Sequence, residues 1–428
     1  MKIRDSRRRA TLRLGSALAA VAVIAGSAAT PSFAAPSSSP TTTPFSTPNT
    51  DGCPQKTRPP APVDESEVPA PGEPTPTALP IPTPPVGGGR LGECGLVLPK
   101  GAPAVPQDIS ATAWQVADLD SGEVLVAKDP HGRYRPASTI KVLLATIALR
   151  TLDLNKVIIG TQDDANADGT RVGIGPGGRY TNRQLMQGLI MASGNDAAHA
   201  IATQLGGEAA TVAKMNELAK SLGALDTRTA TPSGLDGPGM STSAYDLSVL
   251  FREAMTIPLF AEFIHTEQVD FPGYPANPKI EGDKDHPGFP IGNDNHLLYD
   301  YDGAIGGKTG FTDDARQTFV AAAERDDRRL VVTLLKADVR PLRPSDQAAR
   351  LLDYGFALPR GTSVGKLPDP NRKQPKVGAT LASPPPKEQE TQPLADEDHG
   401  DDRTVWVVGG VILVLALLLG ARRMNRRR

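Results

Sequence analysis

The sequence contains little of what metal-dependent and nucleic-acid-binding proteins usually need. Its 428 residues include only 2 cysteines and 6 histidines. Two cysteines cannot form a zinc site alone, and no histidine pair has the HExxH spacing of a zinc site. The formal net charge is -2, and no basic block outside the two ends indicates a nucleic-acid partner. We therefore expect no metal, no cofactor and no nucleic acid.

A phosphate-binding loop is also missing, although the stretch GAIGGKT at residues 303–309 is similar to one. Such a loop needs a glycine, four residues of any kind, and then Gly-Lys followed by Ser or Thr. Counting back from Lys308, the required glycine position holds Asp302, whose carboxylate would repel a phosphate. Lys308 therefore needs a different function.

Both ends of the chain carry signals for export and anchoring. A basic stretch, a short apolar run and a small-residue site follow one another in residues 1–34, which predicts a signal peptide. That run is too short to span a bilayer comfortably, and the export route stays open. Residues 404–421 carry no charge and predict a transmembrane helix, followed by a basic tail at residues 422–428 that should stay in the cytoplasm. We expect the body of the protein outside the cell, on the cell-wall side, with a C-terminal single-pass anchor.

Composition divides the rest of the chain into two linkers and one domain. Residues 35–105 are dense in proline, serine and threonine, which predicts an extended stalk. This stalk contains both cysteines, and an oxidising compartment favours a Cys53–Cys94 disulfide over two free thiols. A second linker, proline-rich and then acidic, is expected at residues 361–403. Residues 106–360 have ordinary apolar content and the size of one domain.

This domain has strand patterns at both ends and helix patterns between them. An early hairpin is predicted at residues 112–129 and a late one at residues 317–337. Residues 138–152 are apolar nearly all round, which indicates a helix buried on every side. Further helices are expected at residues 181–193, 195–207, 209–224, 242–255 and 345–357. The order favours an α+β domain whose sheet joins the first and last segments.

The buried helix begins with a serine and a lysine three residues apart, Ser138 and Lys141. Residues at i and i+3 share a helix face, so the hydroxyl and the amine can meet. A lysine whose pKa is lowered by burial and nearby positive charge can take the proton of a serine nucleophile. The same spacing also occurs by chance, as at Ser363 and Lys366, where a Gly/Pro linker offers no helix to align the two side chains.

Two further short motifs lie in the same domain. Ser-Gly-Asn at residues 193–195 falls at a break between two predicted helices, where it is either a helix N-cap or a second hydroxyl beside a substrate-binding amide. Lys-Thr-Gly at residues 308–310 precedes the late hairpin. A strand carrying these side chains can bind a carboxylate, and the glycine lets its backbone approach closely. Alone, the motif is also typical of a turn with a solvated lysine.

Together, the three motifs resemble those of the penicillin-binding protein and serine β-lactamase superfamily. More narrowly, the chain is similar to the low-molecular-mass D-alanyl-D-alanine carboxypeptidases, peptidase family S11, across most of residues 112–340. The similar stretches are RPASTIKVLLA, LMQGLIMASGNDAAHAIA, TATPSGLD, STSAYDLSVL and GAIGGKTGFTDDARQTFVAAAERDDRRLVV. The resemblance implies an antiparallel sheet flanked by helices, together with an all-helical subdomain.

The resemblance also implies catalytic roles for the matching residues. Ser138 would attack the carbonyl between two terminal D-alanines of a peptidoglycan stem peptide, forming an acyl-enzyme. Lys141 would act as the base, and Ser193 would pass a proton to the leaving amine. Asn195 would orient the substrate backbone. Penicillins and other β-lactams would acylate the same serine.

The third motif would bind the substrate. Lys308 and Thr309 would hold its terminal carboxylate, beside the close backbone at Gly310. The backbone N–H groups of Ser138 and Phe311 would stabilise the oxyanion, an arrangement that typically contributes a few kcal/mol. Lys308 would also help to keep the base uncharged.

Three alternatives stay open at this point. A class A β-lactamase needs a glutamate in an E-x-x-L-N segment, and none occurs between Asn195 and Lys308. A D,D-endopeptidase that cuts cross-links uses the same chemistry. A wall-binding protein without activity would not react with penicillin. Relatives often carry a small β-rich second domain and an amphipathic helix as membrane anchor. In this chain the sequence predicts a proline-rich linker and a membrane-spanning helix in their place.

Overall fold

A computed structural model describes residues 45–370, which are built around a seven-stranded sheet. All strand pairs in this sheet are antiparallel. In spatial order the strands are β1 (Leu96–Val97), β3 (Glu123–Lys128), β2 (Ala113–Asp118), β10 (Arg328–Ala337), β9 (Arg316–Arg325) and β8 (Ala304–Thr312), and β11 (Gly365–Lys366) also pairs with β3. The chain thus joins its first and last strands in one sheet, as the sequence predicts.

Helices cover both faces of this sheet because its central strands are apolar on both sides. In β10, Leu330, Val332 and Leu334 pack with α9 (Pro344–Ala357) on one face. The alternate residues Val331 and Leu335 pack with α6 (Ala244–Ala254) on the other face. This alternation follows the two-residue period of a strand buried between two layers.

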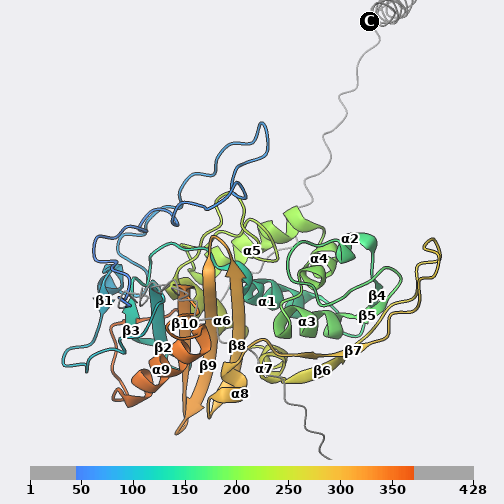
Figure 1. The fold of residues 1–428 in the computed structure, drawn as a ribbon. Helices are drawn as coiled ribbons and strands as arrows, with labels where there is room; N and C mark the ends of the chain where they lie inside the picture. The colour runs from blue at the N-terminus through green and yellow to red at the C-terminus, as the bar shows by residue number, and fades with distance from the viewer. Residues whose placement is uncertain (1–44, 371–428) are drawn as a thin grey trace, which may run out of the picture. The chain divides into compact units, whose positions relative to one another are not determined.

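The helix α1 (Lys141–Thr151) lies in the core, and every residue from Lys141 to Ala148 is buried. It packs against α6 and against a helical region beside the sheet (Figure 1). This region contains α2 (Gln162–Ala165), α3 (Asn182–Met191), α4 (Asn195–Gln204), α5 (Glu208–Leu222) and α7 (Pro258–His265). The same part of the chain holds two small antiparallel sheets, β4–β5 (Val157–Ile159, Arg179–Thr181) and β6–β7 (Gln268–Phe271, Phe289–Gly292), and the short α8 (Leu297–Asp300). The α+β class and the expected helices are confirmed, and the two small sheets were not predicted from the sequence.

The N-terminal proline-rich segment differs from the expected stalk. We refer to residues 45–99 as the strap, which runs in blue along one side of the domain (Figure 1). Its end forms β1 in the main sheet, and a disulfide joins Cys53 to Cys94. The strap buries little apolar surface of its own, but buried side chains of the domain donate hydrogen bonds to it.

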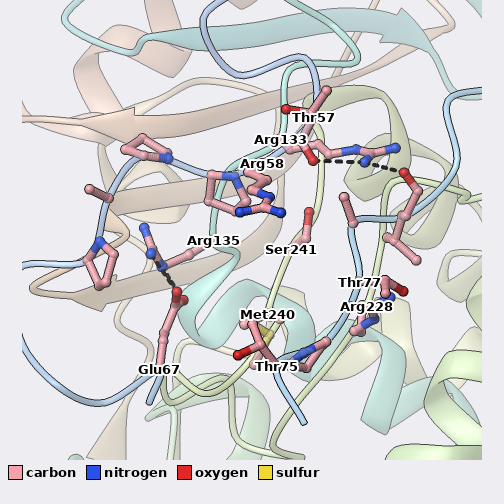
Figure 2. Close-up of a pocket in the computed structure, with 18 residues that line it drawn as sticks. Thr57, Arg58, Glu67, Thr75, Thr77, Arg133, Arg135, Arg228, Met240 and Ser241 are labelled. Carbon is pink, nitrogen blue, oxygen red and sulfur yellow. Dashed lines mark hydrogen bonds and ion pairs between the residues drawn. The ribbon is translucent and has the colours of Figure 1, made fainter. Parts of the chain in front are cut away.

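Arg133 is one such donor. This arginine is almost fully buried, and its guanidinium donates to the carbonyl oxygens of Thr57 (3.0 Å), Leu79 (2.6 Å) and Pro80 (2.8 Å). Proline-rich backbone has carbonyl acceptors without matching N–H donors, so an arginine with five N–H groups satisfies several of them at once. Figure 2 shows Arg133 and Thr57 beside a cavity of about 280 Å³ between the strap and the domain.

The C-terminal boundary also lies later than residue 360. Val364 donates its backbone N–H to Val124 in β3, and β11 continues that pairing. The hydroxyl of Ser363 bonds to the carbonyl of Gly365, so Ser363 and Lys366 share no helical turn. The predicted signal peptide at residues 1–34 and the predicted membrane helix at residues 404–421 lie outside the described residues. Within residues 45–370, no helix has the length and hydrophobicity needed to cross a membrane.

Candidate active site

Ser138 lies in a short 3₁₀ turn, Ala137–Ile140, that leads into α1. Side chains at i and i+3 eclipse each other in this type of helix, so Ser138 stands directly over Lys141. The residue before it, Ala137, has a φ of 47°, a left-handed conformation that a residue with a Cβ rarely adopts. The tertiary structure must therefore hold this turn in place, which is common where a nucleophile is positioned.

Lys141 is the centre of the polar contacts at this turn. Its Nζ lies 2.7 Å from Ser138 Oγ, 2.7 Å from Asn195 Oδ1 and 2.6 Å from the carbonyl oxygen of Ser233. A neutral lysine amine can donate two hydrogen bonds and keeps one lone pair. Because the amide and carbonyl oxygens can only accept, they take the two N–H donors and leave the lone pair facing the serine hydroxyl.

The electrostatic surroundings favour this neutral form. Burial lowers the pKa of Lys141 well below its ordinary value, and the positive charge of Lys308 lowers it further. The carboxylates of Asp196 and Asp294 act in the opposite direction and are the weaker influence. Lys141 is fully buried, while Ser138 is partly exposed to solvent. The arrangement therefore places a reachable hydroxyl next to a buried amine whose surroundings disfavour its charged form.

Lys308 faces the same site from strand β8, the edge strand of the sheet within the described residues. It is 2% exposed, and burial lowers its pKa to about 8 while the carboxylate of Asp294 opposes that shift. Its Nζ donates to the carbonyl oxygen of Thr309 (2.8 Å) and lies 3.4 Å from the Thr309 hydroxyl. This cation has no ion pair within 4 Å among the described residues, so it is available to an anionic substrate.

Gly310 lets strand β8 approach the serine turn. A Cβ at this position would lie 2.8 Å from Ser138 N, 2.9 Å from Thr139 N and 2.4 Å from Thr318 Oγ1. Real Cβ atoms essentially never come so close to other heavy atoms, so only glycine fits here. Thr318 also donates a 2.7 Å hydrogen bond to the carbonyl of Pro136, which ties β9 to the same turn.

Two predicted site residues make fewer contacts. Ser193 lies between α3 and α4 with a φ of 58°, and its hydroxyl makes no hydrogen bond to another described residue. The side chain of Phe311 is 50% exposed, and its backbone pairs with Gln317 of β9. The structure thus joins Ser138, Lys141 and Asn195 by direct hydrogen bonds, while it leaves Ser193 at the helix break without such a bond.

The structure also reveals contributors to which the sequence reasoning gave no role. The carbonyl of Ser233 belongs to a loop that rests on the serine turn, and a Cβ on Gly234 would lie 2.0 Å from the carbonyl oxygen of Ala137. Gly234 has a φ of 87°, which a glycine adopts readily. The Ser-Gly pair in TPSGLD was therefore a usable signal for a tight loop. The carboxylate of Asp294 offered no such signal, because its position depends on the fold.

Two clusters of carboxylate and imidazole groups in the described residues have the spacing of metal ligands. They are His131, Asp226 and Asp246, and Glu67, Asp236 and Asp314. In each cluster an arginine already supplies a positive charge, Arg133 at 3.2 Å from Asp226 and Arg135 at 2.5 Å from Glu67. Neither cluster includes a residue that forms a hydrogen bond with the Ser138 side chain.

The peptidase S11 family, described as D-alanyl-D-alanine carboxypeptidase, matches residues 100–339. The chain belongs to this family. The D-alanyl-D-alanine carboxypeptidase DacB2 of Mycobacterium tuberculosis is 48% identical over 275 residues, which cover 63% of this chain and 90% of that protein. DacD of Salmonella typhimurium is 35% identical over 263 residues, 58% of this chain and 64% of that protein.

Solved structures share the fold of this S11 chain. A crystal structure of D-alanyl-D-alanine carboxypeptidase from Mycobacterium tuberculosis is 48% identical, with a TM-score of 0.58, and covers 63% of this chain and 100% of its own. A Streptomyces DD-transpeptidase is 27% identical, with a TM-score of 0.54, and covers 60% of this chain and 100% of its own. The penicillin-binding fold expected from the sequence is thereby confirmed. Residues 45–99, the strap, lie outside the family match.

Replacing Gly310 with alanine should separate β8 from the serine turn. We expect Gly310→Ala to lower the rate of acylation by a labelled penicillin by at least about tenfold, because the added Cβ must displace Ser138 N or Thr318. Gly292→Ala is the matched control, since a Cβ there meets nothing closer than 4.0 Å. Equal acylation rates in the two variants would contradict this interpretation.

Proposed function

We propose that this chain is a serine D-alanyl-D-alanine carboxypeptidase that removes the terminal D-alanine from peptidoglycan stem peptides. The observation that carries the proposal is the 2.7 Å contact between Ser138 Oγ and the buried amine of Lys141. Membership of the S11 family and the carboxypeptidase names of its relatives support the substrate class.

The acylation step follows from the contacts around Lys141. Its lone pair accepts the hydroxyl proton as Ser138 Oγ attacks the carbonyl carbon of the penultimate D-alanine. The backbone N–H groups of Ser138 and Phe311 receive the negative charge that develops on the carbonyl oxygen. The tetrahedral intermediate then collapses to an ester on Ser138 as the C–N bond breaks, and the proton taken up by Lys141 passes through the Ser193 hydroxyl to the departing D-alanine amine.

Substrate binding uses the strand edge and two side chains. The backbone of β8 offers an unpaired edge within the described residues, along which an extended peptide can add as a further strand. Lys308, with the hydroxyl of Thr309, receives the terminal carboxylate. Asn195 Nδ2 donates one bond to the Asp168 carbonyl at 2.6 Å, which leaves its second N–H for a substrate carbonyl. A cavity of about 460 Å³, lined in part by Asn195 and Ser233, gives space for the rest of the stem.

Water completes the cycle by hydrolysing the ester on Ser138. The same acyl-enzyme can pass its acyl group to an amine, and a structural relative is titled a DD-transpeptidase. β-Lactams would acylate Ser138 in the same way as the peptide does. The balance between water and amine as acceptor is therefore a property to measure together with D-alanine release.

The location of the enzyme is a separate part of the proposal. We infer export by residues 1–34 and anchoring by residues 404–421, because the first segment has the three parts of a signal peptide and the second is uncharged over its whole length. The full chain should sediment with membranes, while a chain that ends at residue 403 should be released into the medium. Sedimentation of both chains would contradict the C-terminal anchor.

A peptide that ends in D-Ala-D-Ala tests the activity directly. We expect the isolated domain to release free D-alanine without cross-linked product, and Ser138→Ala to abolish both this release and labelling by a fluorescent penicillin. Ser363→Ala is the matched control because Ser363 lies in an exposed turn with the same sequence spacing to a lysine. Equal labelling of the two variants would refute the assignment of the nucleophile.

The dependence on pH should reflect Lys308. Because its pKa is about 8, it is charged at lower pH and loses its charge as the pH rises through that value. We therefore expect kcat/KM to fall above about pH 8, since a neutral amine binds the substrate carboxylate less well. Lys308→Arg should remove this alkaline decline, because an arginine stays charged, while the exposed Lys279→Arg should retain it. An unchanged decline in Lys308→Arg would exclude Lys308 as its source.

A further inference from the structure

Arg135 is a buried cation three residues before Ser138. Its side chain is 1% exposed, and its guanidinium is surrounded by carboxylates from three different segments. Glu67 of the strap accepts from Nε at 2.5 Å and from Nη2 at 2.8 Å. Asp314, in the turn between β8 and β9, places its Oδ2 3.8 Å from Arg135 Nε. Asp236, in the loop after Ser233, forms a cluster with these two carboxylates.

Each segment that meets at Arg135 also carries part of the site. The arginine continues directly into the turn that holds Ser138. Asp314 follows three residues after Phe311, and Asp236 follows three residues after Ser233. The guanidinium therefore lies where the serine turn, strand β8 and the loop of the Ser233 carbonyl come together.

The strap binds two of these segments at once. Besides the bidentate pair of Glu67 with Arg135, drawn in Figure 2, the strap donates to the carboxylate of Asp314. The backbone N–H of Val63 lies 2.5 Å from its Oδ1, and the hydroxyl of Ser66 lies 3.4 Å from its Oδ2. Residues 63–67 thus bridge the serine turn and the end of β8 beside Arg135, where the direct pair of Arg135 Nε with Asp314 Oδ2 is long at 3.8 Å.

Charge balance makes Glu67 the principal partner of this arginine. Burial alone would lower the pKa of Arg135, but the hydrogen bonds and charge of Glu67, followed by Asp314 and Asp236, raise it. Nη1 of Arg135 is buried without a hydrogen-bond partner in the described residues. Without Glu67, Nε and Nη2 would also lose their acceptor, and the guanidinium would have to shift toward Asp314 or Asp236.

We propose that Glu67 is a positioning residue for the reaction: through Arg135 and Asp314, the strap fixes the distance between the Ser138 turn and strand β8. The inference rests on the proposed function, because it assigns the oxyanion contacts to the N–H groups of Ser138 and Phe311. A bidentate carboxylate specifies the orientation of a guanidinium more tightly than a single contact does. The strap, which lies outside the family match, thereby becomes part of what holds the active site in place.

The test compares Glu67→Gln with Glu93→Gln in the full chain. Glu93 also lies in the strap and pairs with Arg90, but both side chains are about half exposed and neither makes a hydrogen bond to the serine turn. For Glu67→Gln we expect kcat and the second-order rate constant of penicillin acylation to fall about tenfold, because oxyanion contacts act mainly in the transition state. KM for the D-Ala-D-Ala peptide should change little, and Glu93→Gln should match the unmodified chain.

A purely structural effect of Glu67 would look different. Such an effect would lower the melting temperature and the fraction of active sites that a penicillin titrates, without slowing the sites that remain. Normal acylation per active site in Glu67→Gln would therefore overturn the proposal. Should that variant not fold, Glu67→Asp tests the same point, since it keeps the charge but shortens the reach to Arg135, and an unchanged rate would again contradict the inference. D-Alanine release by the unmodified chain tests the proposed function independently of both variants.

Discussion

The buried amine of Lys141 is the interaction on which the rest of the site depends. A charged lysine in a fully buried position would cost several kcal/mol in lost hydration, and this cost is what drives the amine toward its neutral form. The structure adds a second cation, Lys308, that disfavours the charged form further. Burial and a neighbouring cation both disfavour the ammonium form, so a lysine in these surroundings can act as a base instead of forming an ion pair. Placing Lys141 at the start of α1, in the core of the domain, therefore determines its chemistry as well as its position.

Close backbone packing brings strand β8 and one loop against the serine turn. Glycines at 310 and 234 allow β8 and the loop of residues 231–237 to touch the serine turn from two sides, with spacings that leave no volume for a Cβ. Because each contact is made by backbone, the N–H and carbonyl groups at the serine turn come close to one another with no side chain between them. This explains how a turn with Ala137 in a left-handed conformation can be held with its serine in place.

The sequence predicted those parts of the site that depend on local spacing, and it did not predict those that depend on distant backbone. Ser138 and Lys141 are three residues apart on one helical turn, so their contact follows from local geometry. The carbonyl of Ser233 and the carboxylate of Asp294 come near Lys141 and Lys308 only through tertiary structure. The Ser-Gly pair at residues 233–234 signals a tight loop but not its place beside Lys141, and nothing in the sequence signals Asp294. The order of the main strands and helices was predictable because their apolar periods are clear. The two small sheets were missed, since three- or four-residue strands have too little periodicity to detect.

The strap is rich in proline and yet is attached to the domain, which the composition of the segment alone does not predict. A proline-rich chain cannot bury enough apolar surface to fold alone, but it carries many carbonyl acceptors that a neighbouring domain can satisfy. Here Arg133 and Arg135, both buried, supply donors for strap carbonyls and for a strap carboxylate. Those arginines lie just before Ser138 in the chain, so the groups that retain the strap are continuous with the nucleophile's own turn. A segment held in this way cannot detach without removing hydrogen-bond acceptors from both arginines, which links its attachment to the geometry of the site.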